Sequence, residues 1–519
     1  MTDRYISLLA TLAIVVLPLL VAGQPAIEWQ KCYGGSALDV TRHIDQTSDG
    51  GFIFTGFTTS SNGDVFGFHG SFDAWLVKVD GTGEIQWQRS LGGSADDRGN
   101  AVQQTLDGGY ILAGYTDSNN GDVSGVHGEQ DMWVVKLDSV GEIQWQKCLG
   151  GTAAEMAFSI DQTADGGYVA AGYAESNNGD VSGIHGDADV WIVKLNGNGE
   201  IEWQKCLGGW GGDYSQHIEQ TTDGGFLVVG YTFSNSADVS GNHGEEDIWV
   251  LKLNINGDIE WQKCLGGTDA ERGISGQQTN DGGYIVAGRA SSNDGDVIGN
   301  NGSGDMWAVK LDAGGALQWQ KCMGGSSNDW GNSVVQTVDG GFIVAGHSSS
   351  NEGDVSGNHG GSDMWAVKLN GNGDLQWQKC MGGTEAEQSH ALDLTMDGGV
   401  IVAGFTSSNN GDVSGNHGSN DMWLVKLAGE QVGLSEAGPM RFFFAPNPVI
   451  DLFTISFESQ ARPKHLTMLD PSGRIVHSRT VTDPTSNIVV DITDLDNGLY
   501  HILIDFADGS RALQRLVKA

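Results

Sequence analysis

The sequence predicts an all-β protein whose main part is a seven-bladed β-propeller, followed by a small C-terminal β-sandwich. Three observations predict the propeller: one 58-residue repeat occurs seven times, each copy holds four strand-like runs, and the first and last copies are as regular as the middle ones. Self-similarity at a fixed period indicates a solenoid, a propeller or an array, and four antiparallel strands make one propeller blade. A linear solenoid needs atypical polar end repeats, so a closed ring is favoured.

Two tryptophans mark every repeat. The first set is Trp29, Trp87, Trp145, Trp203, Trp261, Trp319 and Trp377, each followed by glutamine. The second set is Trp75, Trp133, Trp191, Trp249, Trp307, Trp365 and Trp423. We expect both sets to pack between adjacent blades, because burying ~200 Å² of ring at ~25 cal/mol/Å² contributes on the order of 5 kcal/mol. Exposed rings that stack on sugars are the alternative.

The second copy illustrates the strand pattern of one blade. Its strand-like runs are 100–105, 110–116, 132–138 and 142–149. An Asp-Gly-Gly turn at 107–109 joins the first pair, and a long loop at 117–131 separates the second run from the third. The repeats start on a fourth-strand sequence and stop after a third strand. We therefore expect the N-terminal strand to complete the seventh blade and remove two sheet edges.

The six cysteines occur one per repeat: Cys32, Cys148, Cys206, Cys264, Cys322 and Cys380. Equivalent points on neighbouring blades should lie beyond the ~7 Å Cα separation that a disulfide spans. We therefore expect buried free thiols.

Composition and the N-terminus limit the partners. The formal net charge of −39 argues against binding to nucleic acid, which requires clustered Lys and Arg.

Arg4 and the apolar run 6–21 predict a signal peptide over 1–23, with Gln24 as the first mature residue. An uncleaved anchor helix is the alternative. After cleavage, no integral membrane segment is expected. The propeller itself is predicted to span 24–427.

The C-terminal segment differs from the repeats. A linker at 428–440 leads to residues 441–519, which contain three runs of interest: Ala445-Pro446-Asn447-Pro448 with Leu452, Thr454 and Ile455; then Leu469-Asp470-Pro471-Ser472-Gly473-Arg474-Ile475-Val476; then Leu495, Gly498-Leu499-Tyr500 and Lys518. This tail resembles the type A sorting domain of the bacterial type IX secretion system. The resemblance implies that the secretion machinery is a partner, that the protein is secreted or held on the outer-membrane surface of a Gram-negative bacterium, and that the tail is removed. An ordinary accessory sandwich is the alternative. The repeats resemble the Trp- and Asp-Gly-Gly-rich propeller repeats of other proteins with this tail.

Candidate ligand-binding residues lie where one blade passes to the next. An acid occurs there in every copy: Asp39, Asp97, Glu155, Asp213, Glu271, Asp329 and Glu387. We expect a ring of carboxylates near the channel mouth, on loops. The following residue varies, and Arg98, Tyr214, Arg272 and Trp330 are the predicted contacts because Arg and aromatic residues dominate binding hot spots. A second variable position includes Arg42 and His390. Turn capping by the acids, with neutral drift beside them, is the alternative.

The long loops carry two further aspartates in every copy: Asp64, Asp122, Asp180, Asp238, Asp296, Asp354 and Asp412; and Asp73, Asp131, Asp189, Asp247, Asp305, Asp363 and Asp421. Oxygen-rich loops suit calcium, but the spacing is not that of an EF-hand and Asp also makes Asx turns. No other cofactor or metal is predicted.

No nucleophile elbow, phosphate loop or metal-hydrolase motif occurs in the sequence. We therefore interpret the protein as a secreted or cell-surface binding or adhesion module for a glycan or protein. One alternative is a glycan-active enzyme, a glycoside hydrolase or lyase, that uses carboxylates at the channel mouth. The other is a purely structural surface protein.

Overall fold

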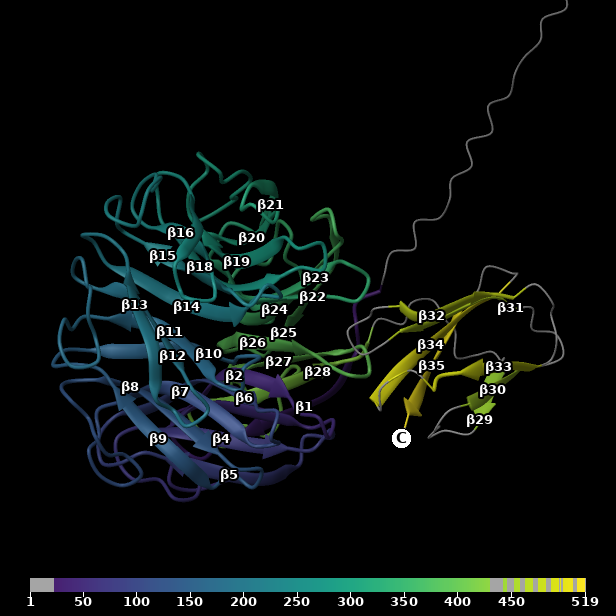
Figure 1. Cartoon of the computed structure of the whole chain (residues 1–519), viewed down its shortest axis with the longest axis horizontal. Helices are drawn as coiled ribbons and strands as arrows, with labels where there is room; N and C mark the ends of the chain where they lie inside the picture. The colour runs from purple at the N-terminus through teal and green to yellow at the C-terminus, as the bar shows by residue number, and fades with distance from the viewer. Residues whose placement is uncertain are drawn as a thin grey trace, which may run out of the picture. The chain divides into compact units, whose positions relative to one another are not determined.

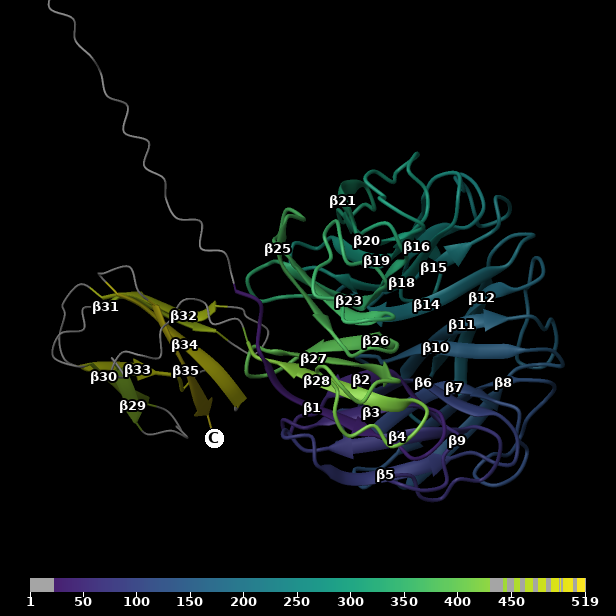
Figure 2. The same cartoon turned by 180° about the vertical axis from the view of Figure 1, so that it is seen from behind.

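The computed structural model describes residues 23–429, 442–445, 452–457, 463–469, 475–481, 487–493, 495, 498–506 and 511–518. The predicted signal peptide, except Gly23, and most of the predicted linker lie outside the described residues. The chain forms two compact units, 1–428 and 429–519. All regular elements of the described residues are strands (Figures 1 and 2).

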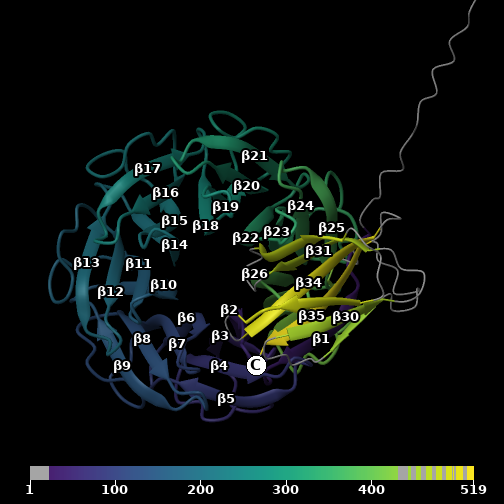
Figure 3. The same ribbon diagram turned by 45° about the vertical axis from the view of Figure 1, so that its right-hand side comes forward.

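The first unit holds seven four-stranded antiparallel sheets arranged around a central axis (Figure 3). The innermost strands are β2 (Asp39–Gln46), β6 (Asp97–Gln104), β10 (Glu155–Gln162), β14 (Asp213–Gln220), β18 (Glu271–Gln278), β22 (Asp329–Gln336) and β26 (Glu387–Leu394). The second strands are β3 (Phe52–Thr58), β7 (Tyr110–Thr116), β11 (Tyr168–Ala174), β15 (Phe226–Thr232), β19 (Tyr284–Ala290), β23 (Phe342–Ser348) and β27 (Val400–Thr406). The third strands are β4 (Asp73–Val79), β8 (Asp131–Leu137), β12 (Asp189–Leu195), β16 (Asp247–Leu253), β20 (Asp305–Leu311), β24 (Asp363–Leu369) and β28 (Asp421–Leu427). The outermost strands are β5 (Ile85–Leu91), β9 (Ile143–Leu149), β13 (Ile201–Leu207), β17 (Ile259–Leu265), β21 (Leu317–Met323), β25 (Leu375–Met381) and β1 (Ile27–Tyr33).

The ring closes through its first strand, as the repeat register predicts. Strand β1 pairs antiparallel with β28 and completes the sheet β1-β28-β27-β26. The indole Nε1 of Trp423 donates to Gln30 Oε1 at 2.7 Å across this junction. The chain is thus an all-β, seven-bladed propeller.

Tryptophan packing joins the blades. The third-strand tryptophans are at most 1% exposed and are among the largest fully buried side chains of the described residues. The outer-strand tryptophans are mostly half-buried, and six of them meet the aromatic ring that opens the second strand of the next blade; Trp87 and Tyr110, for example, lie 5.4 Å apart at 67°. The seventh, Trp377, faces a strand that opens with Val400. The predicted packing role of both sets is confirmed.

The Asp-Gly-Gly turns are held by a buried lysine of the same blade. In the second copy, Asp107 accepts hydrogen bonds from Thr105 Oγ1 at 2.5 Å, Gly109 N at 2.9 Å and Lys136 Nζ. Gly108 between them has a φ of 81°, a conformation that favours glycine. Burial raises the pKa of Asp107, but these hydrogen bonds and the charge of Lys136 together outweigh it and lower the pKa to about 2.

The second unit consists of two sheets. One has the order β29 (Phe442–Ala445), β30 (Leu452–Phe457) and β33 (Asn487–Asp491). The other has the order β32 (Ile475–Thr480), β31 (Pro463–Leu469), β34 (Gly498–Phe506) and β35 (Arg511–Lys518). Side chains of both sheets share one core, as in a small β-sandwich. Buried Lys518 donates from Nζ to the carbonyl of Ile492 at 2.7 Å, which fastens the last strand.

All six cysteines are free thiols, and five of them are buried. Burial raises the pKa of Cys148 and its equivalents to about 12. The part of the chain that the structure describes contains no helix of the length and apolarity that a membrane crossing requires.

Candidate functional site

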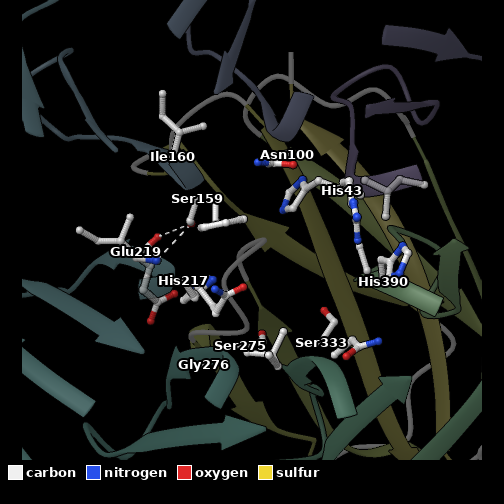
Figure 4. A pocket seen from close by; sticks show the side chains of 18 of the residues that line it. His43, Asn100, Ser159, Ile160, His217, Glu219, Ser275, Gly276, Ser333 and His390 are labelled. Atoms are coloured by element: carbon white, nitrogen blue, oxygen red, sulfur yellow. Dashed lines mark hydrogen bonds between the residues drawn. The ribbon is translucent and has the colours of Figure 1, made fainter. Parts of the chain in front are cut away.

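The seven innermost strands enclose a central cavity of about 710 Å³. That volume falls within the roughly 300–1,000 Å³ typical of small-ligand sites. Figure 4 looks into it, with His43, Asn100, His217 and His390 among the side chains that line it. Every innermost strand carries a β-bulge after its third residue. The bulge brings both the fourth and the fifth residue of each strand to the cavity wall or close to it.

The acid of each copy lies inside the blade. The structure places it as the first residue of the innermost strand, not in a loop, and all seven are 0% exposed: Asp39, Asp97, Glu155, Asp213, Glu271, Asp329 and Glu387. Asp213, for example, accepts hydrogen bonds from Gly209 N at 2.7 Å, Ser234 Oγ at 2.8 Å and Thr232 Oγ1. Burial raises the pKa of Asp213, and these hydrogen bonds partly offset the rise. The expectation of an accessible carboxylate ring at the channel mouth is therefore wrong: the carboxylates bind the ends of the loops.

The residue opposite the acid on the second strand accounts for two of the three Glu residues; the third, Glu387, lies opposite Thr406 and accepts from its Oγ1 at 2.7 Å. In the third and fifth copies, the residue opposite the acid is Ala174 or Ala290, which lack the hydroxyl present in the other copies. The acid in these copies is Glu155 or Glu271, whose longer side chain reaches a loop backbone N–H instead. This compensation indicates a structural role for the acids.

The four predicted contacts that follow the acids fall into two groups, all on strands and all half-buried. Arg98 and Trp330 line the cavity. The guanidinium of Arg98 lies 4.6 Å from the ring centroid of Phe57, and Trp330 stacks on His347 at 6.1 Å. These two side chains lie beside the channel, and strands carry them instead of the loops that the sequence predicts.

The side chains of Tyr214 and Arg272 contact other side chains of the propeller. Tyr214 stacks on Tyr231 at 5.2 Å, and Arg272 lies over the same ring at 5.0 Å. Arg272 also forms a two-point ion pair with Glu246, with Nε to Oε1 at 2.5 Å. Glu246 is only 4% exposed, so Arg272 neutralises a buried charge.

The bulge position presents six kinds of side chain to the cavity. It holds Arg42, Asn100, Phe158, Gln216, Ile274, Asn332 and His390. Asn100 and Asn332 donate to a carbonyl of the next blade at 2.8 and 2.6 Å. His390 Nδ1 lies 2.6 Å from Thr41 O, so this nitrogen carries the hydrogen, and burial lowers the pKa of His390 to about 3. His390 is therefore neutral.

A tier of acids and amides deeper in the cavity was not predicted from the sequence. Asp45, Asp161, Glu219 and Asp393 each accept a backbone N–H from the neighbouring blade, and Gln103 and Gln277 do the same in other copies. Burial raises the pKa of Asp45 to about 7 and that of Glu219 to about 8. The polar residue at the seventh position of six of the seven innermost strands is the signal that could have found it.

The long-loop aspartates order their own loops. Asp131 accepts from His127 N, and its Oδ2 lies 2.6 Å from His127 Nδ1. Asp122 Oδ2 accepts from Gly92 N at 3.2 Å. Over the described residues, no group of three or more His, Cys, Asp or Glu side chains is arranged to hold a metal ion. These contacts favour the structural-turn interpretation of the loops over calcium.

Comparison with known proteins identifies the C-terminal unit. Residues 444–519 match the family described as the secretion system C-terminal sorting domain. The type IX secretion system therefore exports the protein to the cell surface or the extracellular space. A comparison with curated proteins gives no match.

Solved structures similar to this chain include the Pan2 WD40 domain of Neurospora crassa, with 10% identity, a TM-score of 0.43, and coverage of 75% of this chain and 89% of that one. Another is Sqt1 from Chaetomium thermophilum, with 9% identity, a TM-score of 0.41, and coverage of 77% and 100%. Puromycin hydrolase is similar at 12% identity and a TM-score of 0.40, over 94% of this chain and 60% of that one. The chain is an exported seven-bladed β-propeller with a type IX secretion sorting domain at its C-terminus.

Proposed function

We propose that the propeller is a binding module whose ligand, a glycan or a protein surface, enters the central cavity beside Arg98 and Trp330. The supporting observation is the pattern of variation along the innermost strand. Its first residue is a buried acid in all copies, whereas its second and fourth residues differ from blade to blade, and most of them line the cavity. A cavity with such an asymmetric lining suits an asymmetric ligand.

The glycan-active alternative relied on carboxylates at the channel mouth. These carboxylates are fully buried and hydrogen-bonded to the protein, so they do not meet a substrate. A binding role uses the accessible aromatic and cationic groups instead. Aromatic side chains stack on sugar rings and Arg donates several hydrogen bonds, so these groups suit recognition.

A glycan array on the full-length protein tests the proposal, followed by calorimetry on each hit. Trp330→Ala and Arg98→Ala should each weaken binding by about 1–2 kcal/mol. Ser139→Ala changes an exposed turn between β8 and β9 and should leave binding unchanged. Binding that survives both cavity variants but is lost in Ser139→Ala would place the ligand elsewhere. Absence of any glycan or protein ligand would favour the purely structural alternative.

A further inference from the structure

Arg42 stands apart from the other arginines of the propeller. Each of those four binds at least one oxygen of the protein: Arg89 that of Glu142, Arg98 that of Asp96, Arg272 that of Glu246 and Arg289 that of Asn328. Arg42 has no hydrogen-bond or ion-pair partner within the described part of the chain. Its one close contact of note is the ring of Phe57, with the guanidinium carbon 5.5 Å from the centroid.

The position of Arg42 directs this cation into the cavity. It occupies the bulge of β2 and lines the cavity wall together with Arg98. The guanidinium of Arg98 lies over the same Phe57 ring, at 4.6 Å. Two guanidinium groups therefore share one aromatic ring. Burial, and then the charge of Arg98, lower the pKa of Arg42, because no anion of the protein compensates it.

An arginine without an anionic partner, such as Arg42, is unusual in this chain, which has 66 acidic and 27 basic residues. A guanidinium has five N–H donors and accepts no hydrogen bond, so a desolvated one needs an anionic or strongly accepting partner. The nearby His390 is neutral and adds no positive charge. The net charge of −39 also disfavours nonspecific binding of anions, so an anion that binds requires a site built for it.

We propose that the cavity binds an acidic oligosaccharide, with a carboxylate or sulfate of the sugar held between Arg42 and Arg98. This inference rests on the proposed binding function and specifies its ligand class. A saccharide fits better than an acidic peptide because the same cavity wall offers aromatic rings, Tyr115, Phe158 and Trp330, and the amides Asn100, Gln216 and Asn332. Aromatic rings stack on sugar faces, and amides both donate to and accept from hydroxyl groups.

Isothermal titration of the full-length protein with four probes tests the inference: oligogalacturonate, a sulfated galactose oligosaccharide, the uncharged galactose oligosaccharide, and polyglutamate. At least one acidic saccharide should bind, and the preferred one identifies the anion as carboxylate or sulfate. Arg42→Ala should weaken that binding about tenfold or more, because a charge-assisted hydrogen-bond pair is lost. The effect on the uncharged oligosaccharide should be less than about twofold. Arg89→Ala is the matched control: it removes an arginine from outer strand β5, away from the cavity, and should leave binding unchanged.

Different outcomes would overturn the anion site and the assignment of a saccharide as the ligand. If the uncharged oligosaccharide bound as tightly as the acidic ones, and Trp330→Ala but not Arg42→Ala weakened it, the binding function would stand and the anion site would fall. Binding of polyglutamate through Arg42, with no acidic saccharide bound, would overturn the saccharide class. If neither an acidic saccharide nor polyglutamate bound, or if an acidic saccharide bound equally well to the wild type, Arg42→Ala and Arg98→Ala, the anion site would be wrong.

Discussion

Two adjacent positions of the innermost strands differ in what they do. The first holds an acid in all seven blades, is fully buried, and accepts hydrogen bonds from the loops of its own blade. The second holds a different residue in almost every blade and includes Arg98 and Trp330 at the cavity. Identity across the blades therefore marks groups that maintain the blade, whereas the variable position supplies some of the side chains that line the cavity.

Substitution of the buried acid should have the largest effect on stability. Asp213→Ala removes the acceptor of Gly209 N, Ser234 Oγ and Thr232 Oγ1 in a site without solvent. Leaving buried donors unsatisfied costs about 1–3 kcal/mol each, less any relaxation, so we expect a loss of about 3–4 kcal/mol in the free energy of unfolding. Urea denaturation measures it. Glu245→Ala, an exposed acid of a long loop, is the control and should change stability by less than about 0.5 kcal/mol. A small effect of Asp213→Ala would contradict the structural role of the acids.

Arg272 occupies the variable position but has a structural role, because it pairs with the buried carboxylate of Glu246. Arg272→Ala leaves the buried carboxylate of Glu246 without its two-point partner. Removing one member of a buried pair typically costs about 3–5 kcal/mol; since Arg272 is partly exposed, we expect about 2 kcal/mol. The loss should fall below about 1 kcal/mol when Glu246→Gln is added, because the uncompensated charge is then gone. Equal losses in the single and double variants would show that packing of Arg272 over Tyr231 dominates.

Much of the fold follows from the sequence, because a ring of similarly built blades repeats its pattern seven times. The four strands, the turns, the closing strand and the packing of the tryptophans all show in the period. The burial of the acids does not, since their partners such as Ser234 lie 21 residues away and only pairing of the first two strands brings them together.

The sequence predicts only part of the cavity lining, because a β-bulge changes which residues of the innermost strand face the axis. Strict alternation from Val40 and Arg42 would place residues 44 and 46 toward the axis. The bulge between Thr41 and His43 shifts that phase and turns His43 and Asp45 inward. A bulge leaves no clear mark in the sequence, so the inward position of His43 and the deeper tier of Asp45 and its equivalents were missed.

The last prediction concerns the deeper tier. It replaces Glu219 of one copy by the glutamine that other copies have at the same position. Burial raises the pKa of Glu219 to about 8 from an ordinary 4.5, the charge of Asp161 adds to the rise, and the N–H of Gln278 partly opposes it. The folded protein therefore holds a proton between about pH 4.5 and 8 that the unfolded chain releases, so the contribution of Glu219 to stability falls as pH rises through that window. Glu219→Gln cannot ionise, and the equivalent Gln103 and Gln277 already accept the same inter-blade bond.

We expect Glu219→Gln to match the wild type near pH 5 and to exceed its stability near pH 8 by roughly 1–2 kcal/mol, a discounted value because cavity water reduces the desolvation of the carboxylate. Urea denaturation at a series of pH values measures the difference. Burial raises the pKa of Asp45 to about 7 and that of Asp393 to about 6. These two groups titrate in both proteins, so their contributions cancel in the difference in stability. Gln103→Glu is the reciprocal variant: a carboxylate there should destabilise the protein near pH 8 and have little effect near pH 5. If Glu219→Gln changed stability equally at both pH values, protonation of this tier would not contribute, and the variable positions of the deeper cavity would belong with the structural residues of the blade.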